Sequence, residues 1–93
     1  MAARENKVET YLKAKVAALG GISRKWVSPG HSGVTDQIVI IKGQVWFVEV
    51  KTVDGRLSDV QKREHERLIK AGANVTTVYG TSGVDEFIRG WEC

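Results

Sequence analysis

The sequence predicts a single small α/β domain over residues 1–93, with a mixed β-sheet flanked by helices in the order α-β-β-β-α-β-α. Two apolar runs joined by Lys42-Gly43 indicate a β-hairpin. A helical segment separates this hairpin from a fourth strand, and such a crossover favours parallel pairing of the third and fourth strands. Together these patterns indicate a sheet that contains both antiparallel and parallel strands.

The amino-terminal part of the chain predicts a helix, a strand and a loop. The helix is expected at about residues 4–19, because apolar residues recur there at helical spacing and Gly20-Gly21 provides a stop. These apolar residues are Val8, Leu12, Val16 and Leu19. A short strand over 22–27 and a loop over 28–35, which is rich in turn-forming residues, then lead into the hairpin.

The hairpin strands are placed at about 36–41 and 45–51. The apolar run 38–41 does not alternate with polar residues, which predicts burial on both faces of the first hairpin strand. Because side chains alternate between the two faces of a strand, Glu49 and Lys51 project from the same face.

The rest of the chain predicts a helix, a strand and a last helix. Ser58 and Gln61 form the capping-box pattern that starts a helix, expected over 58–71. Residues 75–79 are rich in strand-forming types and are placed as the fourth strand. Thr81 or Ser82 is expected to cap the final short helix, which ends at about Arg89.

Composition favours a globular cytoplasmic protein and leaves its function open. The net charge of +3 permits nucleic-acid binding without requiring it. No apolar run approaches the roughly 20 residues that span a bilayer, and the amino-terminal residues lack a signal core. Cys93 is the one cysteine of the sequence, so neither an internal disulfide nor a zinc site is expected.

Asp36, Glu49 and Lys51 are the main candidates for catalysis. A tight hairpin brings Asp36, at the start of its strand, level with Glu49 near the end of the next. Carboxylates on an apolar sheet are costly unless they are paired or bind a metal, and Mg²⁺ and Mn²⁺ prefer carboxylate and carbonyl oxygens. We therefore expect Asp36, Glu49 and the Val50 carbonyl to bind such a cation, and Glu9 to add a carboxylate from the first helix. Lys51 would assist an attacking water or stabilise the transition state of phosphodiester hydrolysis.

Asp36 followed by Glu49-Val50-Lys51 resembles the D…ExK core of the PD-(D/E)xK nuclease superfamily. The neighbouring blocks narrow the resemblance to the VRR-NUC (virus-type replication-repair nuclease) family over nearly the whole chain. These blocks are RENKVETYL, SPGHSGVTD, VWFVEVKT, GRLSDVQKREHERLIKAGANV and a closing VTTVYG. The resemblance implies a PD-(D/E)xK nuclease-like fold, similar to that of archaeal Holliday junction resolvases.

The resemblance also bears on single residues. The family usually has proline where this chain has Thr35. Because the proline shapes the backbone and binds no metal, we expect this difference to cost little. Glu9, eleven residues before Gly20, matches the resolvase-like spacing of the first-helix carboxylate, and Glu5 is the second choice. Gln61 resembles a glutamine that faces the site in the family, although its capping role accounts for it equally well.

Contacts to DNA are expected from the loop before Asp36 and from basic side chains. A glycine-rich loop can approach phosphates closely through its N–H groups. The loop candidates are Ser28, Gly30, His31, Ser32 and Gly33, and the basic candidates are Arg24, Lys25, Lys42 and Arg56. Catalysis by His31 is not required by the D…ExK chemistry. The basic residues of the 58–71 helix interleave with acidic ones, which is typical of a solvated face.

The expected function is metal-dependent cleavage of DNA, with Mg²⁺ or Mn²⁺ as cofactor. The resemblance implies a phage or prophage enzyme of the bacterial cytoplasm that acts in replication or repair as a homodimer on branched DNA such as Holliday junctions. Three alternatives stay open: a flap nuclease, a single-strand nuclease, and a non-catalytic module that binds DNA or recruits a replication protein.

Overall fold

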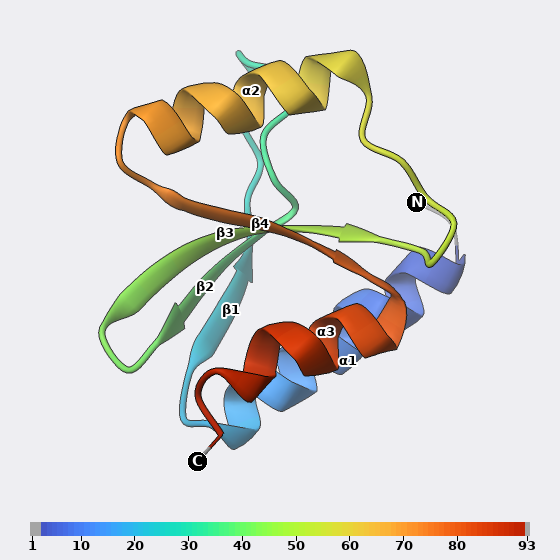
Figure 1. Ribbon diagram of the computed structural model, residues 1–93, viewed down its shortest axis with the longest axis vertical. Helices are drawn as coiled ribbons and strands as arrows, with labels where there is room; N and C mark the ends of the chain where they lie inside the picture. Colours follow the sequence, from blue (N-terminus) through green and yellow to red (C-terminus); the bar gives the residue numbers. More distant parts are fainter. Residues whose placement is uncertain (1–2, 93) are drawn as a thin grey trace.

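The computed structural model describes residues 3–92 (Figure 1). Its elements are α1 (Ala3–Ala18), β1 (Ile22–Lys25), β2 (Gln37–Ile41), β3 (Gln44–Lys51), α2 (Asp59–Lys70), β4 (Asn74–Tyr79) and α3 (Gly80–Arg89). The predicted order α-β-β-β-α-β-α is confirmed. None of the helices among these residues is long and apolar enough to cross a membrane.

The sheet has the strand order β1-β2-β3-β4. β1 pairs with β2 and β2 with β3 in antiparallel fashion, whereas β3 and β4 are parallel. The sheet is therefore mixed, as predicted, and α2 is the crossover between its two parallel strands. The hairpin turns at Lys42 and Gly43, which both have positive φ, as a two-residue type I′ turn requires.

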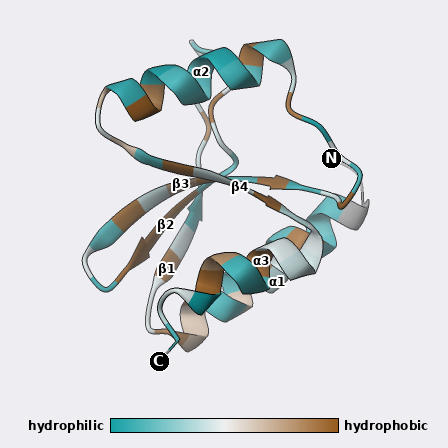
Figure 2. Ribbon diagram, in the orientation of Figure 1, coloured by the Kyte–Doolittle hydropathy of each residue, from teal (hydrophilic) through white to brown (hydrophobic). Residues whose placement is uncertain are grey.

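Helices cover the two faces of the sheet unequally. Figure 1 shows α1 and α3 together on one face and α2 on the other. The core lies between the sheet and the α1–α3 pair, and Figure 2 shows that the strands carry much of the hydrophobic sequence while α2 is largely hydrophilic. The buried apolar residues are Val8, Leu12, Val16, Val39, Ile41, Val48, Val50, Val78, Val84 and Ile88.

Burial of β2 on both faces is a wrong prediction. Residues of β2 alternate in exposure, and Ile40 is 41% exposed. Its cross-strand neighbours Ile22 and Val45 are exposed to a similar degree. The reason is that α2 packs against β4, so the hairpin half of this face is left uncovered.

The predicted cap of the last helix is also wrong. α3 begins at Gly80 directly after β4, its N-cap is Tyr79, and no side chain caps it. Gly80 has φ +67°, and a Cβ there would lie 2.5 Å from Cγ2 of Val53. Glycine therefore permits the chain to turn from strand into helix at once, before Thr81 or Ser82 is reached.

Candidate active site

The candidate site lies at the end of β3, on the face of the sheet that α2 covers. Gln37 pairs with Val48, so Asp36, one residue before β2, is level with Glu49. Gln37 and Val48 face the core between the sheet and the α1–α3 pair. Asp36 and Glu49 are each one residue away from them along the strand, so their side chains project from the other face, toward α2. The structure thus brings the two predicted carboxylates together.

Asp36 is held in place by the backbone of β3. Its Oδ2 accepts a hydrogen bond from the Val50 N–H at 2.9 Å. The N–H and C=O of one strand residue point to the same side of the strand. The Val50 carbonyl is therefore directed toward the side on which Asp36 lies, beyond Gln37, the last β2 residue that pairs with β3.

Glu49 is the buried centre of the site, with an exposed fraction of 3%. Gln61 Nε2 donates a hydrogen bond to its Oε2 at 3.1 Å, and Lys51 Nζ lies 3.7 Å from the same oxygen. Its Oε1 is buried without a hydrogen-bond partner among the described residues. Burial, and then the neighbouring charge and hydrogen bond of Asp36, raise the pKa of Glu49 to about 8, while Lys51 acts in the opposite direction.

Gln61 combines the two roles that its sequence position allowed. Its Oε1 accepts a hydrogen bond from the Ser58 N–H at 2.9 Å, and its own N–H donates to Ser58 Oγ at 3.1 Å, which completes the capping box. The remaining amide group, Nε2, reaches Glu49. The cap therefore orients the glutamine toward the carboxylate.

His65 is a site residue that sequence reasoning missed. It is buried on α2, and its Nε2 lies 4.0 Å from Glu49 Oε1. Burial lowers the pKa of His65, so the ring is neutral at neutral pH and forms no ion pair with Glu49. The signal that could have found it is its spacing of four residues from Gln61, which puts both side chains on one helix face.

The first-helix carboxylates, Glu5 and Glu9, do not form a metal-binding cluster with Asp36 and Glu49. Across residues 3–92, no three His, Cys, Asp or Glu side chains are grouped so as to bind one metal ion. Glu5 is close enough for its charge to contribute to the raised pKa of Glu49. Glu9 has a buried oxygen, Oε2, without a hydrogen-bond partner in the described part of the chain. Both glutamates therefore stay candidates.

The residues of the site nevertheless suit a hard divalent cation. Two carboxyls face each other, and one oxygen of Glu49 lacks the partner that a buried polar atom normally has. Carboxylate and carbonyl oxygens are the ligands that Mg²⁺ and Mn²⁺ prefer. A cation shared by Asp36 and Glu49 would remove both the mutual repulsion and the unpaired oxygen.

The loop before Asp36 is tied to α2. His31 Nε2 lies 2.7 Å from Glu64 Oε1, which also accepts a hydrogen bond from Arg67 at 3.2 Å. Gly33 has φ +86°, and a Cβ there would lie 2.8 Å from the Val60 carbonyl oxygen. The loop is therefore packed closely on the start of α2, and His31 serves this contact rather than facing Glu49.

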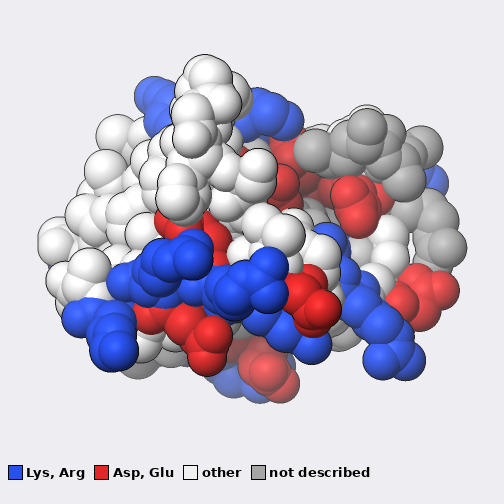
Figure 3. Space-filling model, turned by 90° about the horizontal axis from the view of Figure 1, so that it is seen from above, with Lys and Arg blue, Asp and Glu red and all other residues white. Residues whose placement is uncertain are grey.

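The other predicted DNA contacts lie in the exposed parts of the molecule. Ser28 is half-buried, while the remaining predicted contacts in the loop and on β1 are exposed: Gly30, Ser32, Arg24 and Lys25. Lys25 pairs with Gln37, which places the end of β1 at the Asp36 end of the sheet. On α2, basic and acidic side chains interleave (Figure 3), but the predicted solvated face does not include Glu64, which is buried.

Two comparisons with known proteins give close matches, and no family model matches the chain. The chain is 41% identical over 73 residues to "Putative nuclease p44" of Acyrthosiphon pisum secondary endosymbiont phage 1. The aligned region covers 77% of this chain and 78% of that protein. A solved structure described as "VRR_NUC domain" is 41% identical and has a TM-score of 0.86, over 95% of this chain and 97% of that one.

Proposed function

The chain belongs to the VRR-NUC nuclease family, and we propose that it is a metal-dependent DNA endonuclease whose site is formed by Asp36, Glu49 and Lys51. The observation that carries the proposal is the state of Glu49. A buried carboxyl with an unpaired oxygen, next to a second carboxyl, destabilises the metal-free fold, so its presence calls for a functional use. Binding of a cation at the point of cleavage is such a use.

Asp36, Glu49 and the Val50 carbonyl would hold the Mg²⁺ or Mn²⁺, and Glu5 or Glu9 would support it from α1. When bound, such a cation lowers the pKa of a coordinated water and offsets the negative charge that builds on the phosphodiester oxygens.

Lys51 is the cationic side chain of the site. Its Nζ lies 3.7 Å from Glu49 Oε2, and its side chain is 15% exposed, so it is largely buried but still reaches solvent. From there it can donate a hydrogen bond to the attacking water or to a phosphoryl oxygen. Gln61 holds the Glu49 carboxylate in one orientation while this happens.

The proposed substrate is branched DNA, with the Holliday junction as its first form and a flap as the alternative. Resolving a four-way junction requires two cuts related by a two-fold axis, and a domain of this size has one site. The proposal therefore includes a homodimer. The phage origin of the 41% identical relative supports a role in phage replication or repair.

The test is cleavage of a labelled four-way junction, a flap and a linear duplex in Mg²⁺, Mn²⁺ or EDTA. Glu49→Ala is the inactive variant, and Glu66→Ala, an exposed acid on the outer side of α2, is the matched control. We expect paired, symmetric nicks in the junction that disappear with EDTA and with Glu49→Ala but persist with Glu66→Ala. Cleavage of the flap alone would make the flap the substrate in place of the four-way junction. Cleavage that survives Glu49→Ala would overturn the proposed site.

A further inference from the structure

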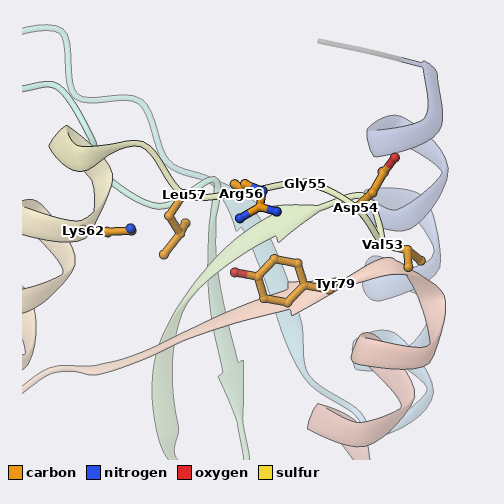
Figure 4. A pocket seen from close by; sticks show the side chains of 7 residues that line it. All are labelled: Val53, Asp54, Gly55, Arg56, Leu57, Lys62 and Tyr79. Atoms are coloured by element: carbon orange, nitrogen blue, oxygen red, sulfur yellow. The ribbon is translucent and has the colours of Figure 1, made fainter.

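A pocket of about 470 Å³ opens beside Lys51, and the cleavage chemistry makes no use of it. Its wall consists of residues 53–57, which follow β3, together with Lys62 of α2 and Tyr79 at the end of β4 (Figure 4). The volume lies in the range of small-molecule sites, which is sufficient for one nucleotide.

Tyr79 places an aromatic ring next to the catalytic lysine. In the parallel pairing of β3 with β4, Lys51 is level with Tyr79, and paired residues project from the same face. Tyr79 is 39% exposed although it is the last residue of β4, and the sheet lies between helices on both faces. Figure 4 shows its ring in the pocket, with the hydroxyl toward Leu57 and Lys62.

Two cations converge on this ring from different elements. Figure 4 shows the guanidinium of Arg56 directed toward Tyr79 and the ammonium of Lys62 directed into the same space from α2. The one acidic residue of the wall, Asp54, points away from the ring, and its Oδ1 accepts a hydrogen bond from Thr52 Oγ1 at 3.0 Å. The interior of the pocket therefore combines positive charge with an aromatic surface.

We propose that this pocket holds one unpaired nucleotide of the DNA strand, next to the phosphodiester that is cleaved at Lys51. Arg56 and Lys62 contact its phosphate, and its base stacks on Tyr79. Positive charge that follows the backbone, combined with an aromatic side chain under a base, is how proteins bind single-stranded nucleic acid. A base inside a duplex is stacked on both faces and cannot present one to Tyr79.

This inference rests on the proposed nuclease function and refines its substrate. The enzyme would select branched DNA because nucleotides at a branch leave the stack at lower cost than those of a continuous duplex. The preference for branches would then depend on Tyr79, whereas cleavage itself would depend on Glu49 and Lys51.

The first experiment measures binding without cleavage. A flap with 2-aminopurine as the unpaired nucleotide at the branch is titrated with the protein in EDTA, beside a duplex with the same base paired. Stacking on Tyr79 should quench the fluorescence of the flap alone, and the quenching should persist with Tyr79→Phe and vanish with Tyr79→Ala. Equal quenching by the wild type and Tyr79→Ala would overturn the proposal.

The phosphate contacts are tested in the same titration. Arg56→Gln and Lys62→Gln should each weaken flap binding about tenfold at low salt and reduce its salt dependence. Lys70→Gln, an exposed lysine at the other end of α2, is the matched control and should change neither. Loss of affinity with Lys70→Gln as large as that with Lys62→Gln would refute the specific contact.

The second experiment compares cleavage rates on the flap and on the continuous duplex. Tyr79→Ala should lower the flap-to-duplex ratio about tenfold, whereas Tyr79→Phe should keep it. An equal loss on both substrates would assign Tyr79 a structural role and overturn the inference. If Tyr79→Ala fails to fold, Arg56→Gln decides in its place, because its side chain is exposed.

The two experiments separate the failure of this inference from that of the proposed function. Quenching without cleavage of any DNA in Mg²⁺ or Mn²⁺ would remove the nuclease proposal and keep the nucleotide pocket. Cleavage without quenching would keep the nuclease and remove the pocket.

Discussion

The Glu49→Gln substitution should stabilise the metal-free protein at neutral and alkaline pH, because it removes a carboxyl that ionises freely in the unfolded chain but only at a cost in the folded one, where it is buried beside Asp36. Burial, followed by the charge of Asp36, raises the pKa of Glu49 from 4.5 to about 8. Complete ionisation of this carboxyl therefore costs on the order of 4–5 kcal/mol more in the folded chain than in the unfolded one. Glutamine has nearly the same shape and carries no charge.

The direction of the pH dependence follows from the raised pKa. A carboxyl whose pKa is higher in the folded state favours folding most below its ordinary pKa of 4.5, and this advantage is lost as the pH rises through about 8. His65 acts in the opposite sense, because burial lowers its pKa and its protonation opposes folding below about pH 6.5. The interval from about pH 6.5 to about pH 9 therefore reports on Glu49.

Urea denaturation in EDTA measures the effect. Across that interval the free energy of unfolding of the wild type should fall by about 2 kcal/mol relative to that of Glu49→Gln. Glu66→Gln, at an exposed position of α2, should follow the wild type. Adding Mn²⁺ should restore the stability of the wild type at high pH but not that of Glu49→Gln. Parallel pH curves for the wild type and Glu49→Gln would refute the reasoning.

Four further substitutions test the site and its support. Lys51→Ala should lower the cleavage rate at least about 100-fold while DNA affinity in EDTA stays nearly unchanged, and retention of full activity would remove the lysine from the mechanism. Ser58→Ala should cost about 1 kcal/mol in urea denaturation and also slow cleavage, because the cap orients Gln61; normal cleavage would show that Gln61 keeps its position without the cap. Gly33→Ala should cost at least about 1 kcal/mol and weaken cleavage, since its φ is +86° and the new Cβ would meet the backbone of α2, and an unchanged protein would contradict that close approach. Leu12→Ala should cost about 2–5 kcal/mol at a fully buried position, and a smaller loss in urea denaturation would mean that the core collapses around the gap.

The hairpin and the position of Asp36 could be predicted because both depend on local rules. The two-residue turn at Lys42 and Gly43 determines which residues of the strands pair, and Gln37 opposite Val48 follows from it. Counting one step further puts Asp36 level with Glu49. The alternation of side chains then puts Glu49 and Lys51 on one face.

Gln61 shows where a local pattern left two interpretations open. The capping box explains the glutamine fully at the level of sequence, so the pattern could not reveal a second contact. The structure shows that one amide does both, because the capping contact uses Oε1 and leaves Nε2 free to reach Glu49.

The sequence by itself determined the order of the elements, the pairing of the hairpin and the D…ExK arrangement, because each follows from spacing within a few residues or from a single tight turn. Tertiary structure alone decided that His65 packs beside Glu49, that Ile40 stays exposed, and that Tyr79 and Lys62 share a pocket with Arg56. These contacts depend on where α2 packs against the sheet and on the parallel pairing of β3 with β4. The crossover helix already favoured the parallel pairing in the sequence. The place where α2 packs against the sheet depends on contacts between segments distant in sequence, and no local periodicity encodes it.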